Sequence, residues 1–322
     1  MNKSKIFLFL LLAFGLSGLV GAAIYLLDIR PGSVVFTIVV ALLFMPTPAL
    51  ATLVVQKLLY QESLAPYGLR FQAIRLPALL WLPVFTTAVV LGTLGLNYLL
   101  GNAGGLPGFG MVDFSPEGLQ LKLAEAAGGA AGEAGAVSTP FSPVQLLLVG
   151  LLGGVVAGFT INLPVMLGEE LGWRGFLFEE TKPLGFWRAS LLIGVLWGLW
   201  HAPVILVGHN YPGQGFAGIG MMVLLCLPLS VLMNYVRVKT RSVWGPAVLH
   251  GIFNASAPVT VLLIHQYNPL LGGITGLAGI LAISLVTTVV LGLDRSFWRE
   301  LAEEGFGGRK PVAAEAEVEM VK

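Results

Sequence analysis

The sequence predicts an all-α fold, a polytopic membrane bundle of about eight transmembrane helices, from its composition and the length of its apolar runs. Hydrophobic residues make up 56% of the 322 residues, charged residues make up 11%, and the mean hydropathy is +0.85. Soluble domains carry roughly 25% charged and about 45–50% apolar residues. These values indicate that lipid, rather than water, surrounds most of the chain.

Eight apolar runs are each long enough to cross a bilayer as a helix, which needs about 20 residues. They lie at residues 6–27, 33–56, 77–100, 144–168, 189–208, 218–236, 243–264 and 270–293. A helix satisfies its own backbone hydrogen bonds, which hydrocarbon cannot do, whereas a membrane barrel would show short alternating strands. We therefore expect every span to be helical.

The runs divide the chain into three regions. Residues 1–143 hold three spans and a long extracytoplasmic loop, residues 144–293 hold five further spans, and residues 294–322 form a polar cytoplasmic tail. The tail alternates charged with small residues, so we expect disorder after Gly305.

The long loop contains one helix-start pattern. Ser115 precedes Pro116 and Glu117, which predicts a short helix up to about Ala127. The Gly- and Ala-rich stretch 128–137 is typical of a flexible linker.

Basic residues fall on one side of the predicted spans. If the N-terminus is cytoplasmic, only Arg30 and Lys122 of the 18 lysines and arginines lie outside. Cytoplasmic loops carry an excess of Lys and Arg. We expect an integral, multi-pass protein of a cell membrane with both termini cytoplasmic, and the short loops without organelle signals favour a prokaryotic membrane.

The apolar residues Phe176, Leu177 and Phe178 indicate that the fourth span continues past Gly168, so the ionisable residues within the membrane fall in only three of the eight spans. They are Glu169, Glu170, Arg174, His201 and His250. Each costs at least about 2.5–3.5 kcal/mol to place in a bilayer, so such residues are expected to be paired or functional. The i,i+4 spacing of Glu170 and Arg174 predicts an ion pair, which leaves Glu169 for chemistry.

The remaining polar groups suit hydrolysis of an amide. His250 and Asn254 stand about one helical turn apart and face the same way. A carboxylate with an imidazole can position a water and take its proton, while Asn or a second His can hydrogen-bond the oxyanion. The chain has no Gly-x-Ser-x-Gly elbow, so a covalent intermediate is less favoured.

A metal site is an open alternative for the same side chains. Glu169, His201 and His250 with a water would make a catalytic zinc set. The sequence lacks His-Glu-x-x-His, and a glutamate pair with an internal Arg is more typical of a carboxylate held anionic. We therefore favour activation of water with no cofactor required, and keep zinc as the alternative.

Three motifs follow one another on successive polar spans. They are Glu169-Glu170-x-x-x-Arg174, Trp197-x-x-x-His201 and His250-x-x-x-Asn254. Their order resembles the CPBP family, the CAAX-protease and bacteriocin-processing membrane peptidases, over about residues 144–265. Trp197 stands where the family pattern commonly has Phe. By this resemblance, residues 144–293 form the catalytic helix bundle.

The resemblance also implies roles for the motif residues. Glu169 and His201 would activate the water, and His250 and Asn254 would stabilise the oxyanion. Glu170 and Arg174 would shape the site. The implied activity is that of an intramembrane endopeptidase acting on a membrane-associated peptide or protein, including prenylated CAAX-like substrates.

Other classes of function use some of the same features. Buried carboxylates and histidines also serve as ion or proton relays in transporters, although the chain shows no inverted repeat. A catalytically silent scaffold or self-immunity protein would keep the bundle without turnover. A net charge of +1 without a basic cluster predicts no nucleic-acid partner. The expected partners are the lipid bilayer and the substrate.

Overall fold

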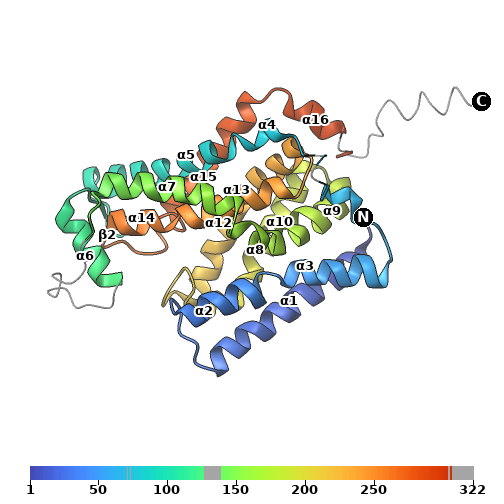
Figure 1. Cartoon of the computed structure of the whole chain (residues 1–322), viewed down its shortest axis with the longest axis horizontal. Coiled ribbons are helices and arrows are strands. Elements are labelled where there is room, and N and C mark those ends of the chain that lie inside the picture. Colours follow the sequence, from blue (N-terminus) through green and yellow to red (C-terminus); the bar gives the residue numbers. More distant parts are fainter. Residues whose placement is uncertain (71, 73, 127–138, 304, 307–322) are drawn as a thin grey trace, which may run out of the picture.

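In the part of the chain that the structure describes, the regular elements are helices apart from two strands of two residues each, which confirms the all-α prediction (Figure 1). The computed structural model describes residues 1–70, 72, 74–126, 139–303 and 305–306. The predicted linker 128–137 and most of the tail after Gly305 lie outside the described residues.

The first half of the chain contributes helices to two opposite sides of the bundle, as Figure 1 shows; short 3-10 and π-helical turns carry the label η. These elements are α1 (Lys3–Leu26), α2 (Val34–Val39), η1 (Val40–Phe44), α3 (Thr47–Thr52), η2 (Leu53–Leu59), η3 (Ala65–Tyr67), α4 (Leu76–Leu79), α5 (Leu82–Asn97), η5 (Tyr98–Ala103), β1 (Met111–Val112) and α6 (Pro116–Ala126).

The second half contributes the remaining helices. They are α7 (Pro143–Phe159), α8 (Asn162–Glu170), η6 (Leu171–Leu177), α9 (Phe178–Thr181), η7 (Lys182–Leu184), α10 (Phe186–Trp200), α11 (Ala202–Leu206), α12 (Gly215–Thr240), α13 (Trp244–Ser256), α14 (Pro258–Leu263), β2 (Ile264–His265), α15 (Leu277–Leu293) and α16 (Phe297–Glu303).

The described helices are long and apolar enough for a polytopic membrane protein. Six spans meet the length and hydropathy needed to cross a bilayer, and two bent helix pairs bring the total up to eight. The eight coincide in order with the eight predicted runs. The short loop helix is also confirmed, because α6 begins at Pro116 and Ser115 Oγ accepts from the Gly118 N–H at 3.0 Å.

The fourth predicted span is not one straight helix, as the apolar run 144–168 suggested. It consists of α7 and a second segment beginning at Asn162, inclined at 63° to each other. Pro164 lacks the N–H that would bond the carbonyl of Thr160, and its ring crowds that carbonyl, so a straight helix cannot continue here. The bend directs α8, which carries both glutamates, into the bundle.

The eighth span also starts later than predicted. Residues 270–276 form turns, and α15 begins at Leu277. Gly273 has φ +74°, a left-handed conformation that interrupts a helix. After α15 the chain turns by 84° into α16, and the Asp294 carboxylate accepts the backbone N–H of Ser296 and Phe297.

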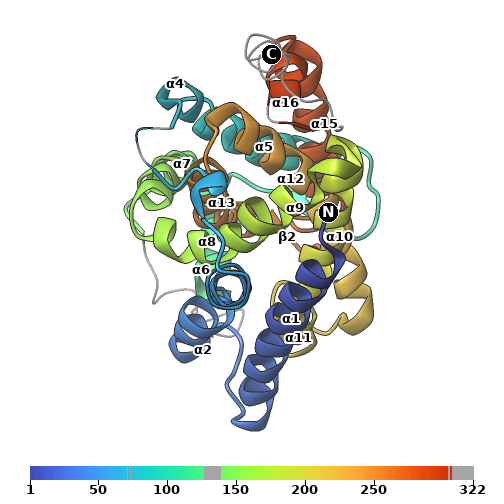
Figure 2. The same ribbon diagram turned by 90° about the vertical axis from the view of Figure 1, so that its right-hand side faces the viewer.

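Helix α12 lies at the centre of the bundle and packs against α10, α13 and α15. On one side α13 packs against α7 and α8, and on another α15 packs against α5. The N-terminal α1 packs on α3, which in turn contacts α8 and η6, as Figure 2 shows from the end of the bundle. The glutamate-bearing segment is therefore enclosed between the N-terminal helices and α13.

Most basic segments gather at one end of the bundle, which we call the basic end. It contains the start of α1, residues 60–70 and 74–75, residues 179–185, the end of α12, and α16. Lys5 is buried there and bonds Glu62 at 2.6 Å and Glu180 at 2.8 Å. Because Lys5 donates to Glu62, the pKa of the Glu62 carboxyl lies below its usual range. This clustering agrees with the charge asymmetry on which the topology prediction depends.

Glycines allow α7 and α13 to approach closely. A Cβ on Gly154 would overlap Ser256, and a Cβ on Gly158 would overlap Ile252. In lipid the hydrophobic effect does not drive helices to associate, so van der Waals packing must do so, and close approach of the two helices increases that packing.

We expect Gly158→Ala to lower the stability of the protein in detergent by about 1–3 kcal/mol, because the added methyl forces the two helices apart. The matched control is Gly153→Ala on the same helix, where a Cβ meets nothing within 4 Å. That change should leave stability equal or slightly raised. Thermal unfolding of the two variants tests this, and equal melting temperatures would contradict the tight α7–α13 packing.

Candidate active site

The two glutamates close α8 and lead directly into a wide turn. Glu169 and Glu170 are 1% and 0% exposed, and the following segment η6 is π-helical and carries Arg174. π-helical turns are rare and occur frequently at functional sites. The pattern of polar residues therefore coincides with an irregularity of the backbone that the sequence did not predict.

Glu170 forms the ion pair predicted from its spacing. Arg174 donates from one guanidinium nitrogen to both Glu170 oxygens at 3.1 Å, and neither side chain is exposed. His250 Nδ1 lies 2.8 Å from Glu170 Oε1. Glu170 thus joins the α8–η6 segment to α13, and its role in shaping the site stays a prediction.

Trp197 of α10 lies at the centre of this group. The Arg174 guanidinium lies 4.2 Å from the centre of the Trp197 ring, a distance that favours a cation–π contact. The rings of His201 and His250 lie 5.8 and 5.4 Å from it. One indole therefore separates and positions side chains that come from three helices.

Trp197 also holds the carboxylate assigned to chemistry. Its Nε1 donates to Glu169 Oε2 at 2.8 Å, while Glu169 Oε1 accepts no hydrogen bond from the described residues. The sequence interpretation noted only that Trp197 stands where the family pattern commonly has Phe, and it missed this donor. The available signal was the identity of the residue, because Phe has no N–H at this place.

The His201 ring has a defined orientation. Its Nδ1 lies 2.7 Å from the Trp197 carbonyl oxygen. A carbonyl only accepts, so Nδ1 carries the proton in the neutral ring and Nε2 presents its lone pair. The same argument applies to His250, whose Nδ1 faces the Glu170 carboxylate. Both imidazoles are therefore fixed by backbone or carboxylate partners and have a second nitrogen for other contacts.

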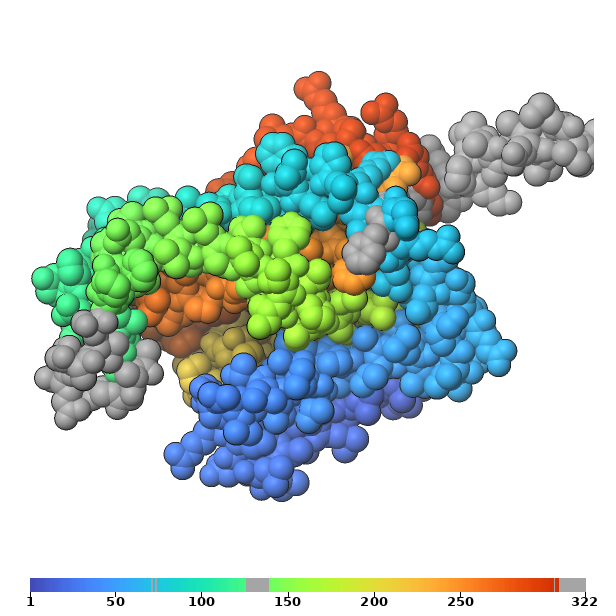
Figure 3. Space-filling model, viewed as in Figure 1, coloured from blue at the N-terminus to red at the C-terminus, as the bar shows by residue number. Residues whose placement is uncertain are grey.

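Asn254 lies one turn further along α13, at the edge of the group. Its Nδ2 contacts Met166 Sδ of α8 at 3.4 Å, and the residue is exposed. Figure 3 shows a hollow between the blue N-terminal helices and the green and orange layer of α7 and α13–α14. The exposure of Asn254 on α13 indicates that this side of the site is reached from the surface.

The structure brings five of the six predicted residues together around Trp197 and leaves Asn254 connected only through Met166. Within the described residues, no three His, Cys, Asp or Glu side chains are grouped closely enough to hold a metal ion. The zinc alternative, in which Glu169, His201 and His250 would be the ligands, stays a prediction.

The helices and the buried carboxylate–imidazole group define a class of protein: a polytopic membrane protein with a candidate water-activating site. Residues 141–256 match the family model for type II CAAX prenyl endopeptidase Rce1-like. The CAAX prenyl protease 2 of Methanococcus maripaludis is 32% identical over 124 residues, which cover 36% of this chain and 40% of that relative. All six motif residues lie within the matched segment.

These matches confirm the resemblance to the CPBP family for the central region of the chain. The chain spans about two fifths of the length of the curated relative it matches. The matched region contains the bent α7–α8 pair, α10, α12 and α13, so it includes every helix that contributes to the site.

We expect Glu170→Gln to destabilise the protein by about 3–5 kcal/mol, because it leaves the buried Arg174 without a counter-charge. Glu303→Gln is the control, since Glu303 pairs with Arg241 at the exposed surface and should cost at most about 1 kcal/mol. Chemical unfolding in detergent measures both. A double variant with Arg174→Met should recover part of the loss, and an equal effect of the two single glutamate changes would contradict the buried pair.

Proposed function

We propose that the protein is an intramembrane endopeptidase that hydrolyses a peptide bond of a membrane-associated substrate with a water activated by Glu169 and His201. The observation that carries this proposal is the geometry around Trp197. Its indole N–H holds one oxygen of a buried carboxylate, and its backbone carbonyl orients a histidine. Glu169 Oε1 and His201 Nε2 are then each available to accept a hydrogen bond from a water molecule.

The first step is proton removal from that water. Glu169 Oε1 and His201 Nε2 are the two available lone-pair sites, and one of them takes the proton as the water oxygen attacks the peptide carbonyl. Burial favours the reaction, because a water-poor site strengthens each interaction that the developing charges make. The same group then returns the proton to the leaving amine.

Oxyanion stabilisation is assigned to His250 and Asn254. Among the described residues, the partner of Asn254 Nδ2 is the Met166 thioether at 3.4 Å, which is a weak acceptor, so the amide can donate to an oxyanion instead. His250 donates from Nε2 only as an imidazolium, and Glu170 at 2.8 Å supplies its counter-charge. In that state, two carboxylates balance one guanidinium and one imidazolium.

The substrate class follows from the relatives rather than from the geometry. The matched family model and the matched relative are both named for CAAX prenyl proteolysis. We propose a CAAX-like peptide or protein substrate, including prenylated ones, that enters through the hollow beside α13. We further propose a prokaryotic cell membrane, with both termini and the basic end on the cytoplasmic side.

We expect Glu169→Gln to reduce cleavage of a peptide library by at least about 10²-fold, the usual contribution of a positioned general base. The library should contain matched peptides with and without a prenyl group. Glu117→Gln, an exposed carboxylate of α6, serves as the control. Wild-type activity in Glu169→Gln would remove Glu169 from the mechanism, and binding without cleavage by the wild type would favour the silent scaffold.

Cleavage should also withstand removal of divalent metal. Wild-type protein treated with a chelator and dialysed is expected to keep its rate, since the proposed base and oxyanion donors are side chains of this chain. The rate is measured before and after zinc is added back. Loss with chelator and recovery with zinc would establish the zinc alternative instead.

We expect Trp197→Phe to lower kcat by about tenfold or more, because the change removes a hydrogen bond to a charged carboxylate, worth about 1.5–3 kcal/mol. Trp200→Phe is the control for loss of indole volume beside the site: it removes a bond to Thr47 at 3.2 Å and reduces the ring contact with His201, but it removes no donor to Glu169. Steady-state kinetics of the two variants should show a clearly smaller effect for Trp200→Phe. Unchanged kcat in Trp197→Phe would show that Glu169 needs no indole donor.

A further inference from the structure

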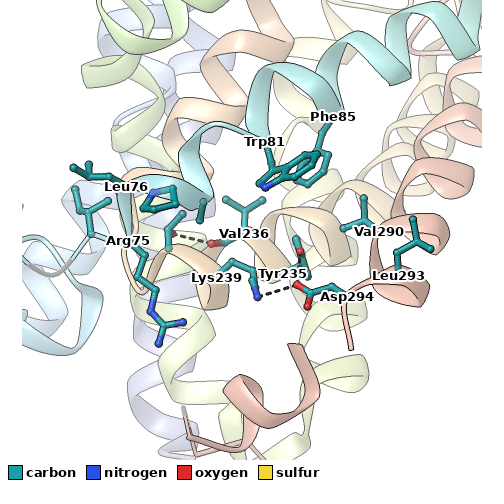
Figure 4. Close-up of a pocket in the computed structure, with 14 residues that line it drawn as sticks. Arg75, Leu76, Trp81, Phe85, Tyr235, Val236, Lys239, Val290, Leu293 and Asp294 are labelled. Carbon is teal, nitrogen blue, oxygen red and sulfur yellow. Dashed lines mark hydrogen bonds and ion pairs between the residues drawn. The ribbon is translucent and has the colours of Figure 1, made fainter. Parts of the chain in front are cut away.

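A second feature of the molecule lies at the basic end, apart from the Glu169 site. It is a cavity of about 830 Å³ bounded by α4 and α5, α12, and α15 (Figure 4). None of the proposed catalytic residues lines it. The cavity therefore needs its own explanation.

The walls of the cavity are mainly apolar. Leu76, Trp81, Phe85, Val236, Val290 and Leu293 line it. Trp81 is 59% exposed and Leu293 is 78% exposed, so the mouth opens where side chains would meet lipid. Trp residues are enriched at the interface between membrane and water. Trp81 thus places the mouth at the level of the lipid headgroups.

The polar end of the cavity contains two cationic side chains, which differ in how many N–H donors they have free to bind an anion. Lys239 Nζ has three partners, Asp294 at 2.9 Å, Glu300 at 2.6 Å and Ser296 Oγ at 2.9 Å, which use its three donors. Arg75 donates from one nitrogen to Glu300 at 2.7 Å, and its side chain is 37% exposed. A guanidinium has five N–H donors, so Arg75 can bind a further anion.

The surrounding charge favours an anion. Arg75 and Lys239 are balanced by Asp294 and Glu300, so these four groups contribute no net charge. Exposed Arg295 and Arg299 then add positive charge beside Asp294. An apolar chamber with a cationic mouth at the headgroup level is complementary to a lipid with an anionic headgroup.

We infer that this cavity binds one anionic phospholipid, with an acyl chain between α5 and α15 and its phosphate at Arg75. Arg75 at the start of α4 already contacts Glu300 of α16. A lipid phosphate bound at Arg75 would therefore lie between α4 and the α15–α16 turn. The inference is independent of the proposed peptidase activity, since it concerns a different surface and is tested by binding.

The test uses full-length protein, stripped of lipid in mild detergent and examined by native mass spectrometry. Dioleoyl phosphatidylglycerol, dioleoyl phosphatidylcholine and inorganic phosphate are added separately. We expect one retained phosphatidylglycerol and weaker retention of phosphatidylcholine. Equal retention of the two lipids would overturn the inference, and binding of inorganic phosphate as strong as that of the lipid would show a free-anion site instead.

Variants separate the cavity from general membrane affinity. Arg75→Gln should weaken phosphatidylglycerol retention about fivefold, the contribution of one cation at a membrane surface. Arg188→Gln removes an exposed arginine at the same end that does not line the cavity, and should have no effect. Val290→Phe fills the cavity but keeps Arg75, so it should reduce retention even if Arg75→Gln affects folding. Full retention in both cavity variants would refute the site.

Discussion

Two carboxylates and a guanidinium lie side by side at the end of α8, in the interior of a chain built mostly from apolar helices. Arg174 bonds both oxygens of Glu170, and its guanidinium lies 4.2 Å from the centre of the Trp197 ring. Removing one partner from such a group leaves a buried charge, which membranes and protein interiors both penalise. The geometry of this ion pair therefore constrains how α8, α10 and α13 pack together.

The backbone accommodates the pair through two irregularities. The bend before Pro164 turns the chain inward, and the π-helical η6 then places Arg174 against the indole of α10. Unsatisfied backbone groups in lipid have no water partner. Every residue of η6 is buried in protein and α3 packs against this segment, whereas residues 159–161 at the bend are exposed. The packing of α3 and α13 on α8 keeps Glu169 buried beside its Trp197 donor.

The sequence could predict which residues belong to the candidate site, but not which of them form hydrogen bonds between helices. Charges inside apolar runs are conspicuous, so Glu169, Glu170 and Arg174 stand out in a sequence, and helical spacing pairs two of them. That His250 bonds Glu170 rather than Glu169 follows from the crossing of α8 and α13. No spacing along one chain segment reports such a crossing, and the role of the site residues in catalysis stays a prediction.

The sequence by itself determined the class of fold and the order of the spans, because long apolar runs in lipid can only become helices. It also determined the short helix at Pro116, whose start depends on local hydrogen bonds to Ser115. Tertiary structure alone decided the choice of Trp197 as the shared neighbour of Glu169, Arg174 and both histidines. It also decided where the cavity at Arg75 lies. These depend on how separate helices pack, and packing distances are set by side chains that meet from distant parts of the chain.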